Sequence, residues 1–284
     1  MWSVRQLIAE GEILPFLQSD WRYAAYAIAD LDLWFFAQCR WWLAESILTV
    51  EGSRADVGRT CAESSPVRPW ALVLLFAGLE PPAVFGLGDP SGVAAILDQA
   101  ALPERVYFTV RPEHWPTVRE HYRLQFEVPM LRMVLGADAL PDCGSDAVRR
   151  LEAADLGSLR ALYALGKPGD ADGFAPFQIE RGVFFGWVED EKLVSVAGTH
   201  LVSLRHGLAA VGNVFTDPAY RGRGHALACT RAVTAALLDQ RLSVVLNVAV
   251  HNTAAVSLYR RLGYKTYCRF FEGVGASKRS TAWS

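Results

Sequence analysis

The residues best suited to chemistry form a short basic turn, Arg221-Gly222-Arg223-Gly224-His225-Ala226. A strand-like run ends at Pro218 before the turn, and an amphipathic helix is expected to begin on it. The first N–H groups of a helix have no partner inside the helix, and the helix dipole is positive there. The glycines let the backbone curl so that these N–H groups converge, while the arginines add positive charge. The turn therefore predicts a binding site for a diphosphate group.

A second segment with chemical potential runs from Asn252 to Tyr264. It contains an expected helix that follows Asn252 and ends at Gly263, with Tyr259 seven residues after the asparagine. Asn252 is a good N-cap for such a helix, whatever else it does. Tyr259 is spaced to face the core, so an ordinary packing role is an open alternative to a chemical one.

Together the two segments resemble the GNAT superfamily of acyl-CoA-dependent N-acyltransferases. The basic turn fits the family's Arg/Gln-x-x-Gly-x-Gly/Ala signature, and the second segment is similar to its motif of Asn, Leu-Tyr and Gly-Phe/Tyr. The resemblance implies acetyl-CoA as co-substrate, no metal, and a diphosphate held by residues 221–226. By the same resemblance, Asn252 contacts the pantetheine or its neighbouring phosphate. Tyr259 would protonate the departing thiolate.

The resemblance also implies where the thioester lies. Pantetheine would enter as a pseudo-strand beside Val214, Phe215 and Thr216, where this strand splays from Leu246–Val248. The amide near Val214 would then stabilise the tetrahedral oxyanion. A small-molecule or peptide amine would attack the thioester directly in a ternary complex, after losing a proton to a base or a water chain.

The general base is the least defined part of the expected site. Several family members carry a glutamate in the strand before the position of Val214, and this chain has none there. His200, within an expected strand at 193–202, is the candidate. A packed or surface histidine is the open alternative.

The C-terminal half has a clear pattern of elements that would position these residues. The expected order is β-α-α-β-β-β-α-β-α-β: the last helices lie over Gly222–Gln240 and Thr253–Leu262, and a strand buried on both faces runs over Ser243–Val250. This order indicates an α/β fold with a mixed sheet and helices on both faces. Asp155 is a plausible N-cap for a helix over Leu156–Leu165.

The N-terminal half is read more coarsely. We expect helices at 4–10, 20–28, 91–100 and 113–121, and strands at 33–38, 70–77 and 105–110. Breaks between Gly136 and Ser145 place a domain boundary there, giving a divergent α/β domain at 1–140 and a GNAT domain at 145–284. The layout resembles glycine N-acyltransferase-like proteins. The N-terminal domain could share the GNAT fold, but it lacks the Arg-x-x-Gly-x-Ala element and is not expected to bind CoA.

Composition excludes several other classes. The 284 residues carry 28 basic and 30 acidic side chains, for a net charge of −2, so a general nucleic-acid binder is not expected. Five scattered cysteines indicate reduced thiols and the cytoplasm, and offer no metal motif. Neither a signal-peptide core nor a membrane-spanning run is present, since Trp70–Leu79 is too short to span. We therefore expect a soluble protein that acts away from membranes; the sequence leaves its oligomeric state open.

Three further alternatives remain open. The glycines of Gly86–Gly92 are wrongly spaced for a dinucleotide loop, and a turn into a helix explains them. The aromatic clusters Trp34–Phe36 and Trp41–Trp42 are expected in the core or at a domain interface, although they could line an acceptor pocket. Lastly, the chain could be a non-catalytic acyl-CoA sensor or interaction module instead of an N-acetyltransferase.

Overall fold

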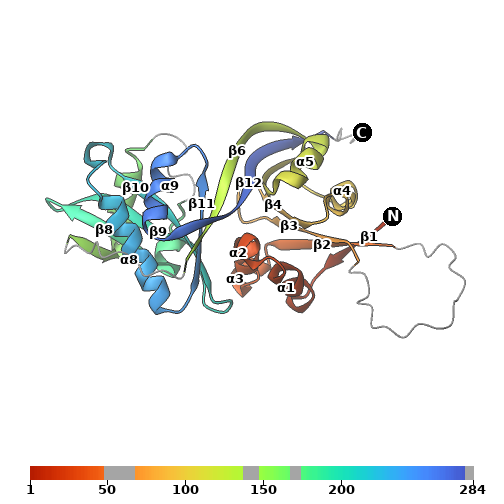
Figure 1. Ribbon diagram of the computed structural model, residues 1–284, viewed down its shortest axis with the longest axis horizontal. Helices are drawn as coiled ribbons and strands as arrows, with labels where there is room; N and C mark the ends of the chain where they lie inside the picture. Colours follow the sequence, from red (N-terminus) through yellow and green to blue (C-terminus); the bar gives the residue numbers. More distant parts are fainter. Residues whose placement is uncertain (48–67, 137–146, 167–173, 279–284) are drawn as a thin grey trace, which may run out of the picture. The chain divides into compact units, whose positions relative to one another are not determined.

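The computed structural model describes residues 1–47, 68–136, 147–166 and 174–278. They form two compact units whose segments alternate along the chain (Figure 1). Unit 1 contains residues 1–19, 37–127 and 271–284, and unit 2 contains residues 20–36 and 128–270. The predicted boundary between residues 140 and 145 lies outside the described residues, so it stays a prediction. What the structure adds is that a segment from the N-terminal half, residues 20–36, packs in unit 2.

Unit 1 is built on a sheet of strand order β1-β2-β3-β4-β5-β12. Only β4 and β5 are parallel, and helix α4 connects them. The helix packs its apolar side on β2 and β3, where Ala71, Val73 and Ile96 are fully buried. The elements are β1 (Trp2–Leu7), α1 (Glu10–Gln18), β2 (Cys39–Ser46), β3 (Trp70–Phe76), β4 (Ala83–Gly88), α4 (Pro90–Gln99), β5 (Arg105–Val110), a 3-10 turn (Pro112–His114) and α5 (Trp115–His121).

Unit 2 is built on a sheet of strand order β6-β11-β10-β9-β8-β7. Strands β10 and β11 are parallel and are connected by α8, whereas the other paired strands are antiparallel. The elements are α2 (Trp21–Ala29), α3 (Leu33–Phe36), β7 (Val148–Leu151), α6 (Leu156–Tyr163), α7 (Phe177–Arg181), β8 (Phe184–Glu189), β9 (Lys192–Ser203), β10 (Leu208–Thr216), α8 (His225–Asp239), β11 (Ser243–Ala249) and α9 (Thr253–Arg261), with 3-10 turns at Ala153–Asp155 and Pro218–Tyr220.

Two long strands, β6 (Tyr122–Leu135) and β12 (Tyr264–Ser277), contribute to both units. Each half of the sequence ends in one of them, after the same series of an antiparallel meander, a helix, a parallel strand and a second helix. The last strand of each half pairs with the parallel strand of the other half, because β6 pairs with β11 and β12 with β5. The two halves therefore share one order of elements, although their residues show no repeat.

Strand β10 lies between two layers of unit 2. Successive side chains of a strand point to opposite faces of the sheet, so β10 contacts both layers. Ala209 and Val211 face the cluster that contains α8 and α9, whereas Ala210 faces Ala25 of α2. Helices α6 and α7 cover a further part of the sheet through a cluster that includes Leu159 and Phe215. Both faces of β10 are thus buried, which explains its run of small and aliphatic residues.

The expected order of elements in the C-terminal half is confirmed, but two N-terminal predictions are wrong. Residues 4–10 were expected to be helical, yet Trp2–Leu7 is a strand paired with β2, because Trp2 and Val4 alternate with polar residues and pack on the unit 1 core. Residues 33–38 were expected to be a strand, but Leu33–Phe36 is one helical turn closed by bonds to the Asp32 carbonyl. Strands β2, β4 and β6 were not predicted.

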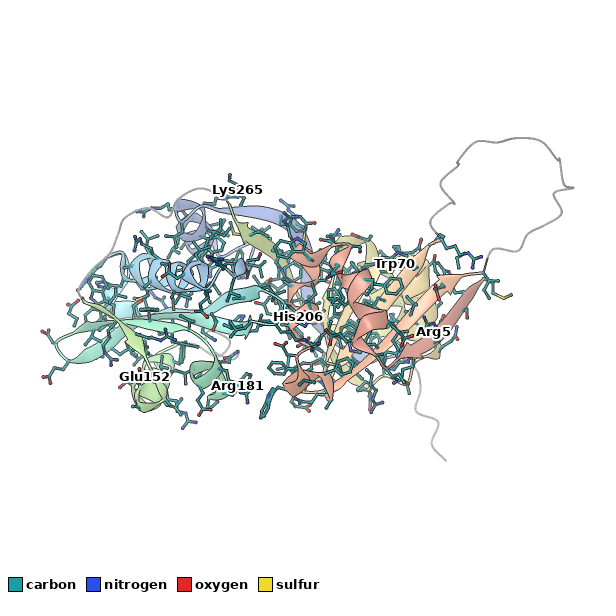
Figure 2. All side chains as sticks on the ribbon, turned by 90° about the horizontal axis from the view of Figure 1, so that it is seen from below. Arg5, Trp70, Glu152, Arg181, His206 and Lys265 are labelled. Carbon is teal, nitrogen blue, oxygen red and sulfur yellow. The ribbon has the colours of Figure 1, made fainter. Side chains whose placement is uncertain are left out.

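The aromatic clusters fall in different places. Trp41 and Trp42 are buried in unit 1, on β2. On α3, Phe35 packs edge-on against Phe177. The guanidinium of Arg181, a residue of α7 labelled in Figure 2, lies 3.9 Å from the ring centroid of Trp34. Trp34 is still 56% exposed, so part of this cluster is surface and not core.

Candidate functional site

The turn before α8 is shaped by its own hydrogen bonds. Asp217 caps the short 3-10 turn, since one of its carboxylate oxygens accepts the Ala219 N–H at 3.0 Å. The other oxygen accepts a 2.7 Å bond from Lys192, and this bond holds the pKa of Asp217 below its usual range. The Arg221 side chain donates to the carbonyl of Thr216 at 3.2 Å. These contacts fix the path of the chain into the helix.

The N–H groups that follow are free of internal partners. Within the described residues, no hydrogen bond is donated by the backbone of residues 222–227. Gly222 and Gly224 have φ angles of 79° and 87°, which only glycine adopts without strain. A Cβ at either position would meet no protein atom within 4 Å, so the space beside the turn is open. Six consecutive N–H groups beside open space at a helix N-terminus are well suited to bind an anion.

His225, the first residue of α8, lies beneath this turn. Its ring is 6% exposed and packs on Trp187 with the ring centroids 4.2 Å apart. Its Nε2 is 3.7 Å from a carboxylate oxygen of Glu189, and the same carboxylate lies 3.5 Å from Arg223. The Arg223 guanidinium also covers the Tyr220 ring at 5.0 Å. His225 and Arg223 therefore share one acidic neighbour beside the turn.

The second part of the candidate site is the end of β10. Its pairing with β11 stops at Val211–Leu246, so the residues from Gly212 to Thr216 leave β11. A β-bulge then shifts β10 against β9 around Asn213, whose φ is 53°. Bulges of this kind bend a strand and stop its regular pairing. The expected splay of β10 from β11 is confirmed.

Asn252 and Tyr259 lie on or beside α9. The Asn252 side chain caps the helix by accepting the Ala255 N–H at 3.2 Å. Tyr259 is 6% exposed and belongs to the same apolar cluster as Val248, against which Val214 packs. Burial raises the pKa of Tyr259 to about 12, and its hydroxyl makes no hydrogen bond to any described residue. Packing thus explains where this side chain lies, but not its unpaired hydroxyl.

His200 lies on the opposite face of β10. It is the extra residue of a bulge in β9, where Ala210 pairs with Leu201 and Val211 with Thr199. Its Nε2 would be 2.3 Å from a Cβ at Gly212, so the imidazole fits only because Gly212 has no side chain. Burial lowers the pKa of His200 to about 4, which makes the ring neutral at physiological pH. The structure therefore places His200 and Tyr259 on different faces of β10, each close to its splayed end.

Several polar residues near this end were not predicted from the sequence. Asn213 donates to the Gln178 side chain and to the carbonyl of Thr199, both at 3.1 Å. Gln178 donates in turn to the carbonyl of His200 at 3.0 Å, and the Tyr163 hydroxyl donates to the carbonyl of Asn213 at 2.8 Å. No spacing rule links these residues, because they come from α6, α7 and two strands. The network holds the bulge of β10 in place.

The equivalent helix start in unit 1 differs in a decisive way. Helix α4 also follows a strand that begins a parallel pair, but its N-cap is Asp89. The Asp89 carboxylate accepts the N–H groups of Ser91 and Gly92 at 2.8 and 3.4 Å, and its pKa is lowered by the added bond from the Ser91 hydroxyl. The turn around Gly86–Gly92 is therefore a capped entry into a helix, and its own carboxylate fills the place of an anion.

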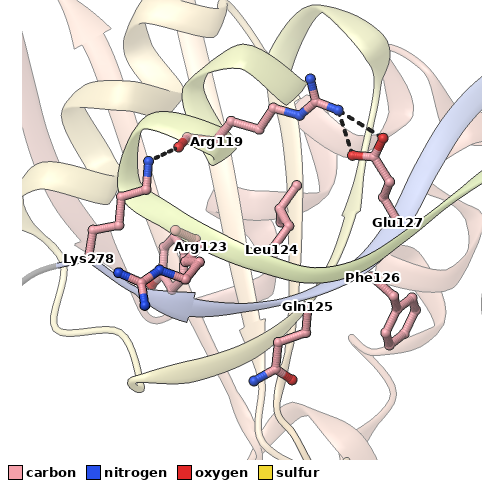
Figure 3. A pocket seen from close by; sticks show the side chains of 8 residues that line it. Arg119, Arg123, Leu124, Gln125, Phe126, Glu127 and Lys278 are labelled. Carbon is pink, nitrogen blue, oxygen red and sulfur yellow. Dashed lines mark hydrogen bonds and ion pairs between the residues drawn. The ribbon is translucent and has the colours of Figure 1, made fainter.

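Unit 1 also contains a shallow depression of about 500 Å³ (Figure 3). Arg119 and Glu127 form a two-bond ion pair at its rim, and Lys278 donates to the carbonyl of Arg119. Among the described residues, no cluster of three or more His, Cys, Asp or Glu side chains could hold a metal ion. None of the described helices is long and apolar enough to cross a membrane.

Comparisons with known proteins bear on this geometry. Residues 153–264 match the model of the acetyltransferase (GNAT) family. No curated protein matches the chain. Among solved structures, a Drosophila protein aligns over 96% of this chain and 98% of its own, at a TM-score of 0.63 and 13% identity. A GCN5-related N-acetyltransferase from Sphaerobacter thermophilus aligns over 96% and 95%, at 0.55 and 17%. A putative GNAT-family acetyltransferase from Novosphingobium aromaticivorans aligns over 68% and 84%, at 0.52 and 22%.

Proposed function

We propose that the chain transfers the acetyl group of acetyl-CoA to a primary amine, because residues 153–264 match the model of the acetyltransferase (GNAT) family. The family and the fold support acyl transfer from an acyl-CoA to an amine as its general activity. The choice of acetyl, the direct transfer and the residue roles are our proposal. The observation that carries it is the set of unbonded N–H groups at residues 222–227 beside the splayed end of β10.

In this proposal the turn before α8 binds the diphosphate of the coenzyme. The N–H groups of residues 222–227 donate to the phosphate oxygens, and the helix dipole adds to the attraction. Arg221 and Arg223 supply positive charge at its edge. His225 and Ala226 form the first residues of the helix beneath the anion. Asn252, at the start of α9, contacts the pantetheine while it caps its helix.

The pantetheine arm continues along Val214, Phe215 and Thr216. A strand that has lost its neighbour presents unpaired backbone groups, and an extended ligand can pair with them. The N–H near Val214 donates to the thioester carbonyl, which polarises it and stabilises the oxyanion after attack. The coenzyme thus lies beside the part of β10 that follows Val211 and no longer pairs with β11.

The chemical step is direct transfer in a ternary complex. The amine nitrogen forms a bond to the thioester carbon, and the nitrogen proton passes to Nε2 of neutral His200. The carbon–sulfur bond then breaks, its electron pair stays on sulfur, and the CoA thiolate takes the proton of Tyr259. The raised pKa of Tyr259 keeps this proton in place until the thiolate forms. Solvent later removes the proton from His200 and restores that of Tyr259.

A non-catalytic acyl-CoA sensor is the second candidate. It is favoured by the low pKa of His200, because a weakly basic imidazole is a poor proton acceptor. The unpaired hydroxyl of Tyr259 in an apolar cluster favours the enzyme instead, since core packing alone needs no hydroxyl there.

A thiol-release assay separates the two candidates. The full chain and acetyl-CoA are incubated with amino acids, polyamines, aminoglycosides and peptides, and free CoA is measured. We expect release above the hydrolysis background with at least one amine class, together with an acetylated amine by mass spectrometry. Tight binding of acetyl-CoA without acetylation of any amine in the panel would support the sensor.

A further inference from the structure

Helix α2 comes from the N-terminal half of the sequence but packs in unit 2. Its N-cap is Asp20, whose side chain accepts the Tyr23 N–H. Ala25 of this helix is fully buried against Ala210 of β10 and Val245 of β11. Small side chains let a helix approach a sheet closely, so α2 lies directly over the two strands that part at Val211.

Tyr26 is the residue of α2 that reaches the candidate site. Its hydroxyl lies 3.0 Å from Nδ1 of His200, and the two rings meet edge to face with centroids 6.2 Å apart. The guanidinium of Arg132, which is 1% exposed on β6, lies 4.7 Å from the centroid of the Tyr26 ring. A cation over the face of an aromatic ring attracts it and restricts its motion. Tyr26 is thus held on one side by Arg132 while its hydroxyl meets His200.

The other nitrogen of His200 has a different environment. Nε2 lies over Gly212, at the point where β10 leaves β11, and it makes no hydrogen bond to any described residue. A neutral imidazole carries one proton, and the hydrogen bond of one nitrogen determines which nitrogen has it. A hydroxyl that accepts from Nδ1–H would leave the lone pair on Nε2.

We propose that Tyr26 is a positioning residue for the transfer reaction: its hydroxyl oxygen accepts the Nδ1–H of His200 and so directs the Nε2 lone pair toward the attacking amine. The proposal rests on the proposed function, and it gives the N-terminal half a part in the acceptor side of the site. Other ionisable groups lie on the elements that pack around β9 and β10: Arg22 and Tyr23 of α2, its C-cap Asp30, Arg132 of β6, Arg160 and Tyr163 of α6, and Glu180 and Arg181 of α7. Burial, and not a nearby charge, sets the pKa of His200.

The tautomer can be measured without knowing the acceptor. Long-range ¹H–¹⁵N NMR of the full chain at pH 7 distinguishes protonated from unprotonated ring nitrogens, and the His200→Gln variant assigns the signals. We expect wild-type His200 as a single neutral tautomer with an unprotonated Nε2. In Tyr26→Phe, both tautomers should be populated. A wild-type ring protonated at Nε2, or a Tyr26→Phe spectrum identical to the wild type, would overturn the proposal.

Kinetics provide the second test, with an amine identified by the thiol-release assay. Tyr26→Phe should lower kcat at least tenfold and change the acidic limb of the pH profile, with the Kd for acetyl-CoA unchanged. Tyr267→Phe is the matched control, because its exposed hydroxyl bonds to Asp20, the N-cap of α2, at 2.6 Å and does not contact His200. Equal kcat and pH profiles in Tyr26→Phe and Tyr267→Phe would reject the role of Tyr26.

The two proposals can fail separately. If wild-type protein does not bind acetyl-CoA by calorimetry, the proposed function is wrong whatever the tautomer. If acetyl-CoA binds and an amine is acetylated, but removing the Tyr26 hydroxyl changes neither the tautomer nor kcat, only the role of Tyr26 is wrong.

Discussion

Single residues in this site are explained by what surrounds them more than by their type. Tyr259 and Tyr264 are both buried and their rings meet edge to face at 6.0 Å. The Tyr264 hydroxyl bonds to Thr234 at 2.9 Å, whereas that of Tyr259 has no partner among the described residues. A structural tyrosine and a candidate acid thus lie side by side, which provides a natural comparison.

Removal of the Tyr259 hydroxyl tests its role as the acid. In Tyr259→Phe we expect kcat to fall by on the order of 10²-fold, because the thiolate would have to leave without a proton donor. The KM for acetyl-CoA should stay within about a factor of two, a margin that corresponds to a small binding free energy. Steady-state thiol release measures both constants.

Tyr264→Phe serves as the control for this prediction. It should cost about 1 kcal/mol of stability, since Thr234 loses a buried partner. Its kcat should equal that of the wild type. If the two variants lose the same small fraction of kcat, Tyr259 is a packing residue.

Much of the candidate site could be located from residue types, but not its proposed acceptor side. The turn at residues 221–226, Asn252 and Tyr259 lie in two continuous segments, so their spacing is visible in the sequence. His200 was found only as a candidate, and Tyr26, Asn213 and Gln178 were missed. These residues meet through bulges and through a helix far away in the chain, and neither leaves a local pattern.

At the scale of elements, the start of a helix decides whether an anion can bind. Helix α8 begins after Gly224, which offers no side-chain cap, whereas α4 begins after Asp89, which fills its own N-terminus. Both helices join two parallel strands. The difference between a turn that could bind an anion and a structural turn therefore lies in one capping position.

The turn itself can be tested with a backbone-matched pair of variants. Gly224→Ala should weaken CoA binding at least tenfold, because an L-residue disfavours the φ of 87° and its methyl group would project into the open space beside the N–H groups. It should also cost about 1 kcal/mol of stability.

Gly207→Ala is the control, because it introduces a similar backbone strain at a position outside the candidate site. Gly207 lies in the turn between β9 and β10 at a φ of 66°, and a Cβ there also meets no atom within 4 Å. We expect a similar loss of stability, measured by urea unfolding, and unchanged CoA affinity, measured by calorimetry. Equal affinities in the two variants would show that the α8 turn does not hold the coenzyme.

Predictions from sequence at this scale succeeded where apolar periodicity was strong and long. The order of elements in the C-terminal half follows from such patterns, as does α4 after Asp89. Short segments failed. Residues 33–36 form one helical turn that is closed by local bonds to the Asp32 carbonyl. Residues 2–7 form a strand, because pairing with β2 and packing on the unit 1 core override a weak local preference. Strand β2 was not predicted, because its residues Trp41 and Trp42 were interpreted only as an aromatic cluster.

At the scale of the whole molecule, the two halves repeat one order of elements and exchange their last strands. Such an exchange is invisible to a sequence pattern, because a strand looks the same whichever sheet it joins. It also means that each unit needs residues from both halves. Residues 20–36 extend this dependence to the candidate site.

Buried ionisable groups make the stability of the fold depend on pH. Burial and the neighbouring Asp32 raise the pKa of Asp30, the C-cap of α2, to about 7. The folded state therefore binds a proton that the unfolded state releases at lower pH, and stability should fall as the pH rises from about 4 to about 7. Burial of His200 acts in the opposite direction, because it lowers the pKa of the imidazole from 6.5 to about 4. The unfolded state therefore binds a proton that the folded state does not, and stability should fall as the pH drops from about 6.5 to about 4.

Asp30→Asn isolates the first effect, because asparagine resembles the protonated acid. We expect little difference from the wild type at pH 4 and a gain of up to about 4 kcal/mol at pH 8. Urea unfolding at the two pH values measures this, and the His200→Gln variant controls for the opposing histidine. A variant that is less stable than the wild type at pH 8 would show that the Asp30 charge is stabilised in the folded state.

Because the two halves repeat one order of elements, the number of CoA molecules bound per chain tests whether the α8 turn is the coenzyme site. Of the two described helices that connect parallel strands, α8 begins with unbonded N–H groups, whereas Asp89 caps the start of α4. Isothermal titration calorimetry of the full chain with CoA should therefore give one binding site per chain, and Gly224→Ala should abolish or strongly weaken it. No heat of binding with either CoA or acetyl-CoA, or a site that is indifferent to Gly224→Ala, would contradict the account.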